Sequence, residues 1–180
     1  LALAQRLRAP IVVCTTGLNT TQQQLIDDAS KRVAVMYAAN TSVGICLLEQ
    51  LVALTSASLP SADIEILEAH HGAKRDAPSG TALLLGAAAA KGRGQQLTEV
   101  NAGLRGEGLR AAGSIGFAVL RAADIIGEHT VCAAQPGERL ELTHRVSDRR
   151  VFARGALHAA RWLSAQTAGR YRLADSLQLE

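Results

Sequence analysis

Aromatic residues are scarce in this sequence, since Phe, Tyr and Trp together make up 3% of its 180 residues. Stacking of nucleic-acid bases needs such side chains, and an excess of 19 basic over 16 acidic residues is too small for a basic binding face. We therefore expect no nucleic-acid partner. Because 48% of the residues are hydrophobic and 19% are charged, the chain is predicted to fold around a core.

Cysteine is also rare, and Cys14, Cys46 and Cys132 show no C-x-x-C spacing. This odd, scattered set predicts neither a disulfide framework nor a zinc site, so we expect no metal and a cytoplasmic location. No hydrophobic run reaches the roughly 20 residues that span a bilayer, and the first ten residues lack the layout of a signal peptide, so no membrane partner is expected. The first residue is Leu1 rather than Met, which predicts that the chain is a piece of a longer protein.

The first 40 residues show a strand, helix and strand pattern. Residues 11–14 and 33–38 are short apolar runs, as in the strands of a buried parallel sheet. Between them, Thr20 and Gln23 have the spacing of a capping box that opens a helix over 20–32. The pattern predicts a right-handed βαβ unit.

Small polar residues follow both of these predicted strands, at 15–17 and 39–42. The carboxyl ends of neighbouring parallel strands meet at one edge of a sheet, where such folds bind ligands. These residues are compatible with a nucleotide or nicotinamide edge. Ordinary turns and helix caps explain them equally well.

The remaining chain predicts a mixed α and β architecture. Apolar spacing and alternation predict helices over 43–56, 81–91 and 149–165 and strands over 63–69, 114–121, 129–135 and 139–146. Residues 135–138, Gln-Pro-Gly-Glu, predict a hairpin turn, and the glycine-rich stretch 92–113 predicts a long loop. The fold class is therefore α/β, with a parallel first part and a mixed, largely antiparallel sheet after it.

Residues 68–82, EAHHGAKRDAPSGTA, carry the strongest chemical signal. An apolar strand leads to His70 and His71, and the loop that follows holds Lys74, one of few lysines in an arginine-rich chain. The segment closes with 79–81, Ser-Gly-Thr, where main-chain N–H groups, the helix dipole and two hydroxyls form an anion site. An imidazole, an ammonium and an anion site suit a small carboxylate substrate that takes up a proton.

Each of these residues also has a purely structural interpretation. Ser79 is a good helix cap without any ligand, and a loop histidine is more often structural than catalytic. Strand alternation places His70 and His71 on opposite faces, which makes them poor ligands for one metal ion. An unrelated metal enzyme is therefore a distant alternative.

The whole segment matches the pattern E-x-H-H-x-x-K-x-D-A-P-S-G-T-A and therefore resembles the dihydrodipicolinate reductase family. Similar family segments occur in order along the chain, at 14–17, 38–44, 115–117, 121–130, 141–145 and 152–156. The resemblance implies a reductase of lysine and diaminopimelate biosynthesis. In that family, hydride passes from NADPH or NADH to a cyclic dicarboxylate, giving tetrahydrodipicolinate.

The resemblance also implies roles for individual residues. His70 would donate the proton, and Lys74 would be the second proton-transfer and substrate-binding group. The substrate carboxylates would contact His71, Ser79, Gly80 and Thr81. The nicotinamide end of the cofactor would contact Cys14, Thr15, Thr16, Ala38, Ala39, Asn40 and Thr41.

By the same resemblance, residues 1–41 would be the remnant of a Rossmann-like nucleotide-binding domain whose first half is absent. Residues 42–148 would bind substrate and join the subunits of a homotetramer, and 149–180 would form a helix that packs back on the nucleotide-binding domain. These 180 residues contain no glycine-rich phosphate loop, which predicts an N-terminal truncation. The alternative is a truncated or decayed, non-catalytic dicarboxylate-binding or assembly module of the same fold.

Overall fold

The computed structural model describes residues 1–177 and divides into two compact units. One contains Leu1–Cys46 together with the C-terminal segment from Arg149, and the other contains Leu47–Asp148. Within the described part of the chain, no helix has both the length and the apolar character needed to cross a bilayer.

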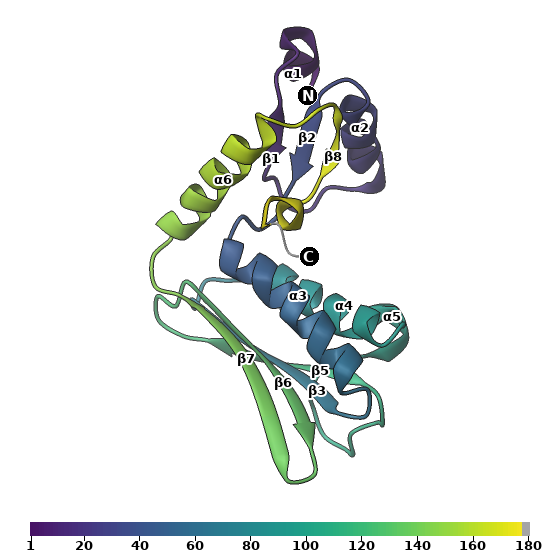
Figure 1. Cartoon of the computed structure of the whole chain (residues 1–180). Helices are drawn as coiled ribbons and strands as arrows, with labels where there is room; N and C mark the ends of the chain where they lie inside the picture. Colours follow the sequence, from purple (N-terminus) through teal and green to yellow (C-terminus); the bar gives the residue numbers. More distant parts are fainter. Residues whose placement is uncertain (178–180) are drawn as a thin grey trace. The chain divides into compact units, whose positions relative to one another are not determined.

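The first unit is built on a three-stranded parallel sheet (Figure 1). Its strands, in spatial order, are β1 (Ile11–Val13), β2 (Ala34–Tyr37) and β8 (Gly169–Tyr171). The helices of this unit are α1 (Ala2–Leu7), α2 (Thr20–Ser30), α6 (Arg150–Leu163) and the 3-10 helix η1 (Leu173–Leu177). The parallel pairing of β1 with β2 confirms the βαβ prediction, whereas α1 and β8 were not predicted because they are too short to show a period.

Alternate residues of β2 serve the two faces of this sheet. Val35 packs with Ile26 of α2 in one buried cluster, and Met36 packs with Leu163 of α6 in another. The start of α2 differs from its prediction, because Asn19 is the cap and exchanges hydrogen bonds of 2.9 Å with Gln22. The capping box therefore lies one residue before the expected pair.

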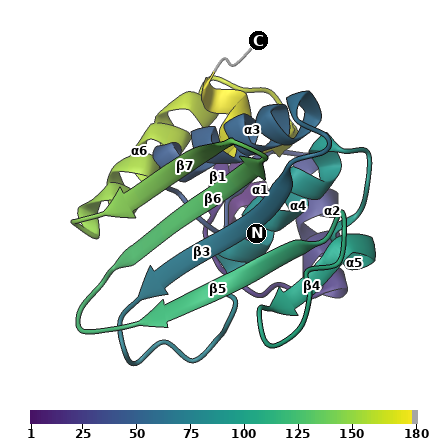
Figure 2. The ribbon, with the colours of Figure 1, turned by 90° about the horizontal axis from the view of Figure 1, so that it is seen from below.

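The second unit contains a five-stranded mixed sheet (Figure 2). Its strands, in spatial order, are β4 (Asn101–Leu104), β5 (Ile115–Arg121), β3 (Asp63–His70), β6 (Gly127–Gln135) and β7 (Glu138–Val146). Pairings of β3 with β5 and of β5 with β4 are parallel, whereas those of β3 with β6 and of β6 with β7 are antiparallel. The helices α3 (Val43–Ser58), α4 (Gly80–Gly92) and α5 (Leu97–Val100) lie on one face of this sheet (Figure 1).

The stretch 92–113 corrects the prediction of a single long loop. It contains α5 and β4, each of four residues, and only 105–114 connects β4 to β5 as a loop. Elements this short show no hydrophobic period, and Gly103 interrupts the strand pattern with a φ of 67°. The hairpin prediction is confirmed, since Gln135 pairs with Glu138 across a turn in which Gly137 has a φ of 87°.

The two faces of the five-stranded sheet differ in their environment. Ile64, Ile66 and Glu68 of β3 are buried on the face that carries the helices. On the opposite, open face, Leu67 and Leu120 are 46% and 54% exposed. The alternation of β3 thus separates a buried face, which ends in His70, from an open one.

Candidate functional site

The site begins at the carboxyl end of β3, where two titratable side chains point to the same face of the sheet. The His70 Nδ1 atom lies 2.5 Å from Oε2 of Glu68. The Glu68 side chain is fully buried, whereas that of His70 is 12% exposed. A buried carboxylate therefore anchors an imidazole that keeps some access to solvent.

Three further donors surround the Glu68 carboxylate. Arg121, at the end of β5, donates from Nη1 to Oε2 at 2.8 Å and from Nη2 to Oε1 at 2.9 Å, and the main-chain N–H of Ser79 donates to Oε1 at 2.9 Å. Burial favours the neutral acid, but the hydrogen bonds from Arg121, His70 and Ser79 outweigh it and hold the pKa of Glu68 below its ordinary value. Glu68 is therefore a carboxylate at neutral pH, buried but compensated.

The pKa of His70 lies below its ordinary value, chiefly because burial disfavours the imidazolium. The hydrogen bond and negative charge of Glu68 act in the opposite direction, and the positive charges of Lys74 and Arg121 lower the pKa further. A dianionic ligand would counter those positive charges and favour the protonated ring.

Lys74 lies in the turn after β3 and contacts Asp76, with Nζ 2.7 and 2.9 Å from the two carboxylate oxygens. The hydrogen bond from Lys74 holds the pKa of Asp76 below its usual range. Since Asp76 is 59% exposed, this pair is weak and its ammonium can change partners. His71 is half-buried in the same turn, beyond the last residue of β3.

The predicted anion site forms the start of α4. Ser79 is the N-cap, and its Oγ accepts from the Ala82 N–H at 3.2 Å. Gly80, the first helical residue, is exposed, and nothing lies within 4 Å of the position that a Cβ would take there. The first turn of α4, which contains Gly80 and Thr81, therefore lies with its positive dipole end beside the Ser79–Glu68 contact.

His129 of β6 is a second imidazole in this site. Its Nε2 lies 3.1 Å from Oγ of Ser79, and its ring contacts that of His70 edge to face with centroids 5.2 Å apart. Burial lowers the pKa of His129 to about 4, and its Nδ1 has no hydrogen-bond partner within residues 1–177. His129 is therefore a neutral ring behind the helix cap.

The structure brings His70, Ser79 and the start of α4 together, and it adds Glu68, Arg121 and His129, for which the sequence reasoning predicted no role. One signal was available, since alternation along β3 puts Glu68 on the same face as His70. The register that pairs Glu68 with His129 across β3 and β6 is not visible in the sequence. Among residues 1–177, no three potential metal ligands cluster.

The residues predicted to contact a cofactor lie in the other unit, at the adjoining ends of β1 and β2. Cys14, Thr15, Thr16 and Ala39 are exposed there, and the Ala38 N–H donates to the Val13 carbonyl oxygen at 3.0 Å. Exposed main chain and small side chains at the ends of parallel strands fit the flat nicotinamide end of a dinucleotide.

Thr41, at the end of this turn, is held from behind by α6. Its buried hydroxyl donates to the Phe152 carbonyl oxygen at 2.7 Å. A Cβ on Gly155 would lie 1.7 Å from the Thr41 carbonyl oxygen, so only glycine allows this approach. The Asn40 carboxamide oxygen accepts from the Ser42 N–H at 2.9 Å, which further defines the turn.

The two sheets define an α/β fold in which a buried carboxylate anchors a histidine beside a helix N-terminus. The family model described as dihydrodipicolinate reductase, C-terminus, matches residues 44–177. The chain therefore belongs to the dihydrodipicolinate reductase family, enzymes of lysine and diaminopimelate biosynthesis.

Individual relatives agree with this assignment. The chain is 50% identical over 175 residues to the 4-hydroxy-tetrahydrodipicolinate reductase of Zymomonas mobilis, covering 96% of this chain and 69% of that protein. It is 46% identical over 182 residues to the reductase of Pseudomonas fluorescens, covering 99% and 68%. The fold resembles the dipicolinate-bound dihydrodipicolinate reductase from Paenisporosarcina sp. TG-14, with a TM-score of 0.77, 23% identity and coverage of 99% of this chain and 68% of that one.

Proposed function

We propose that this chain acts as a 4-hydroxy-tetrahydrodipicolinate reductase, using NADPH or NADH to reduce a cyclic dicarboxylate to tetrahydrodipicolinate. One observation carries the proposal: the His70 imidazole is anchored on the buried Glu68 carboxylate beside the N-terminus of α4. This arrangement places a proton donor next to an anion site, which is what reduction of a ring carrying two carboxylates needs.

Each predicted site residue has a task in this reaction. His70, as imidazolium, donates a proton from Nε2 to the substrate ring while Glu68 holds its Nδ1. The first turn of α4, through Gly80 and Thr81, binds a carboxylate. Lys74 leaves Asp76 for the dianionic substrate and acts as the second proton-transfer group.

The remaining predicted contacts complete the substrate and cofactor sites. Ser79 and His71 lie alongside the bound carboxylates. NADPH or NADH would be held by Cys14, Thr15, Thr16, Ala38, Ala39, Asn40 and Thr41, and when bound it supplies the hydride. These residues fit the nicotinamide end, whereas the 180 residues contain no glycine-rich loop for the pyrophosphate.

This assignment gives the two units separate tasks. The unit with β1, β2 and α6 binds the cofactor, and the unit with the five-stranded sheet binds the substrate. The three cysteines, Cys14, Cys46 and Cys132, show no C-x-x-C spacing, a cysteine usage typical of proteins from a reducing compartment. We therefore place the enzyme in the cytoplasm.

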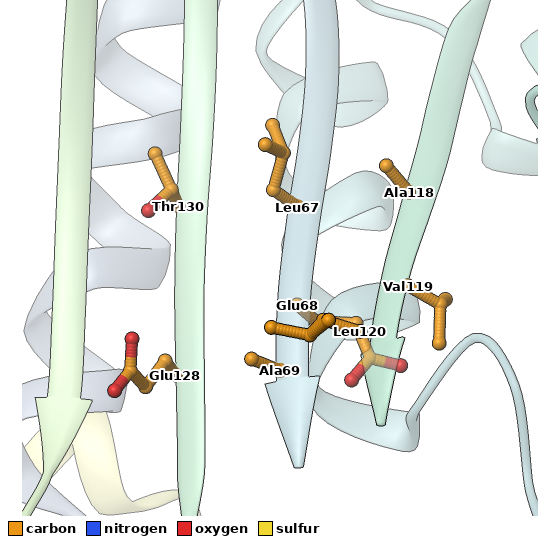
Figure 3. A pocket seen from close by; sticks show the side chains of 8 residues that line it. All are labelled: Leu67, Glu68, Ala69, Ala118, Val119, Leu120, Glu128 and Thr130. Atoms are coloured by element: carbon orange, nitrogen blue, oxygen red, sulfur yellow. The ribbon is translucent and has the colours of Figure 1, made fainter. Parts of the chain in front are cut away.

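The open face of the five-stranded sheet supports a homotetramer. Figure 3 shows a hollow on this face, lined by side chains that include Leu67, Ala118, Leu120 and Thr130. The leucines are 46% and 54% exposed in the single chain, and an uncovered sheet face with such side chains is a surface for association. Two such faces from copies of this chain would cover each other.

Calorimetric titration with pyridine-2,6-dicarboxylate, a stable planar dicarboxylate, tests the substrate site. We expect binding by the unmodified chain and at least roughly tenfold weaker binding by Lys74→Ala, because a charge-assisted hydrogen bond contributes about 1.5–3 kcal/mol. Lys31→Ala is the matched control, since Lys31 also contacts a nearby carboxylate, that of Asp28, at 2.7 Å but lies in the other unit.

The titration has two outcomes that count against the proposal. No binding of the dicarboxylate, or equal weakening by Lys74→Ala and Lys31→Ala, would remove the assigned substrate site. Binding without any reduction in the presence of NADPH would favour the non-catalytic dicarboxylate-binding module instead.

A further inference from the structure

Glu68 has a hydrogen-bond arrangement that constrains the protonation of its neighbour. An ionised carboxylate only accepts hydrogen bonds, and Glu68 receives them from Arg121, from the Ser79 N–H and from His70 Nδ1. The 2.5 Å contact with His70 therefore requires a proton on Nδ1. When the ring is neutral, its Nε2 must then carry the lone pair.

We infer that Glu68 is the positioning residue of His70: its buried carboxylate fixes the ring orientation and the Nδ1–H tautomer, and Arg121 holds the carboxylate in place. The inference rests on the proposed function in one respect, since it takes Nε2 to be the atom that exchanges the proton with substrate. Glu68 itself does not touch the reacting atoms. It acts through the ring, as a carboxylate does behind many acid–base histidines.

The surroundings of Nε2 agree with this assignment. A Cβ on Gly127 would lie 3.2 Å from Nε2 and 3.5 Å from Cδ2 of His70. A larger residue at position 127 would therefore cover the Nε2 edge of the His70 ring, which lies opposite the contact with Glu68. Gly127 does not have a positive φ, so the backbone of this strand does not require a glycine there. The glycine instead leaves space near Nε2 of His70.

The charges around the ring predict opposite effects for two substitutions. Glu68→Gln removes the negative charge that raises the His70 pKa, so the pKa of His70 falls and the Nδ1–H tautomer loses its fixed acceptor. Arg121→Gln removes a positive charge that lowers it, so the pKa of His70 rises. These shifts follow from charge alone, so the protonation of Nδ1 is the readout that separates positioning by Glu68 from a nearby charge.

Nitrogen-15 NMR of histidine-labelled protein tests the inference directly. The chain has 5 histidines, and comparison with His70→Gln assigns the His70 ring signals. For the unmodified protein above the His70 pKa, we expect Nδ1 protonated and Nε2 unprotonated. Titration of Glu68→Gln and Arg121→Gln should then show the two opposite shifts, and kcat of Glu68→Gln should fall about 10- to 100-fold with a smaller change in KM.

Glu65→Gln is the matched control. Glu65 is on the same strand and is also paired with an arginine, since Arg105 Nε lies 2.9 Å from both of its oxygens, but it points to the opposite face. We expect the tautomer and the pKa of His70 to be unchanged in this variant. An effect equal to that of Glu68→Gln would mean that any charge on β3 controls the ring.

Two results would overturn the inference. An Nε2–H tautomer in the unmodified protein would do so without any variant, even if Glu68→Gln did not fold. A Glu68→Gln variant that folds and keeps both the Nδ1–H tautomer and the kcat of the unmodified protein would do so as well. If instead the NMR results are as expected but no reduction occurs, the positioning stands and the proposed function fails.

Discussion

On acidification, the free energy of unfolding should fall less in a His129→Gln variant than in the unmodified protein. Burial lowers the pKa of His129 to about 4, so the folded protein excludes a proton that the unfolded chain binds below about pH 6.5. The contribution to the free energy of unfolding is therefore complete above pH 6.5 and is lost as pH falls toward 4. Over that interval, at about 1.4 kcal/mol per pH unit, the loss amounts to about 3 kcal/mol.

Urea denaturation from pH 7.5 to 4, followed by circular dichroism, measures this dependence, and hydrogen exchange of β6 peptides localises it. The amide of Gln can still contact Ser79, so the slope against pH, rather than the absolute stability, is the readout. His158→Gln is the matched control, because Nε2 of His158 lies 3.1 Å from Oγ of Ser176 but the imidazole is exposed. Parallel stability curves for the unmodified protein and His129→Gln would refute the reasoning.

Three further substitutions test other parts of the structure. Gly155→Ala places a Cβ 1.7 Å from the Thr41 carbonyl oxygen and should lower the free energy of unfolding by about 1–3 kcal/mol or more, measured by urea denaturation; an unchanged midpoint would contradict that close approach. Gly127→Ala should lower kcat with little change in Tm, because its methyl group would lie 3.2 Å from His70 Nε2, and a drop in Tm alone would argue against the assigned role of that atom. Leu120→Asp, on the open sheet face, should shift sedimentation velocity from tetramer to smaller species, and an unchanged tetramer would exclude this face as the contact.

Local signals in the sequence were sufficient for much of the fold. The Pro-Gly turn after Gln135 specifies its hairpin because Gly137 can adopt a positive φ. The βαβ unit could be predicted because each apolar run is bounded by polar residues. In contrast, β4 was missed, since four residues carry no period and their parallel pairing with β5 is irregular in register.

The residues of the candidate site could likewise be predicted from the sequence only in part. His70, Lys74 and Ser79 lie within one short segment, so their types and their spacing in the sequence are enough to indicate carboxylate chemistry. Arg121 and His129 come from two other strands. Only the register of β3 with β5 and β6 brings Arg121 to the Glu68 carboxylate and His129 to Ser79 and the His70 ring. A contact that depends on three-strand register has no local sequence signal.

The strand β3 separates the proposed substrate site from the open face of the same sheet. Its even-numbered residues from Ile64 to His70 face the helices, where Ile66 is fully buried and Glu68 is enclosed by donors. Its odd-numbered Leu67 faces the open side. Because the side-chain period of a strand is two, a slip of one residue would exchange the two sets and destroy both surfaces together. The ion pair of the buried Glu68 carboxylate with the partly exposed Arg121 opposes such a slip, since moving Glu68 to the open face would leave the guanidinium without its carboxylate.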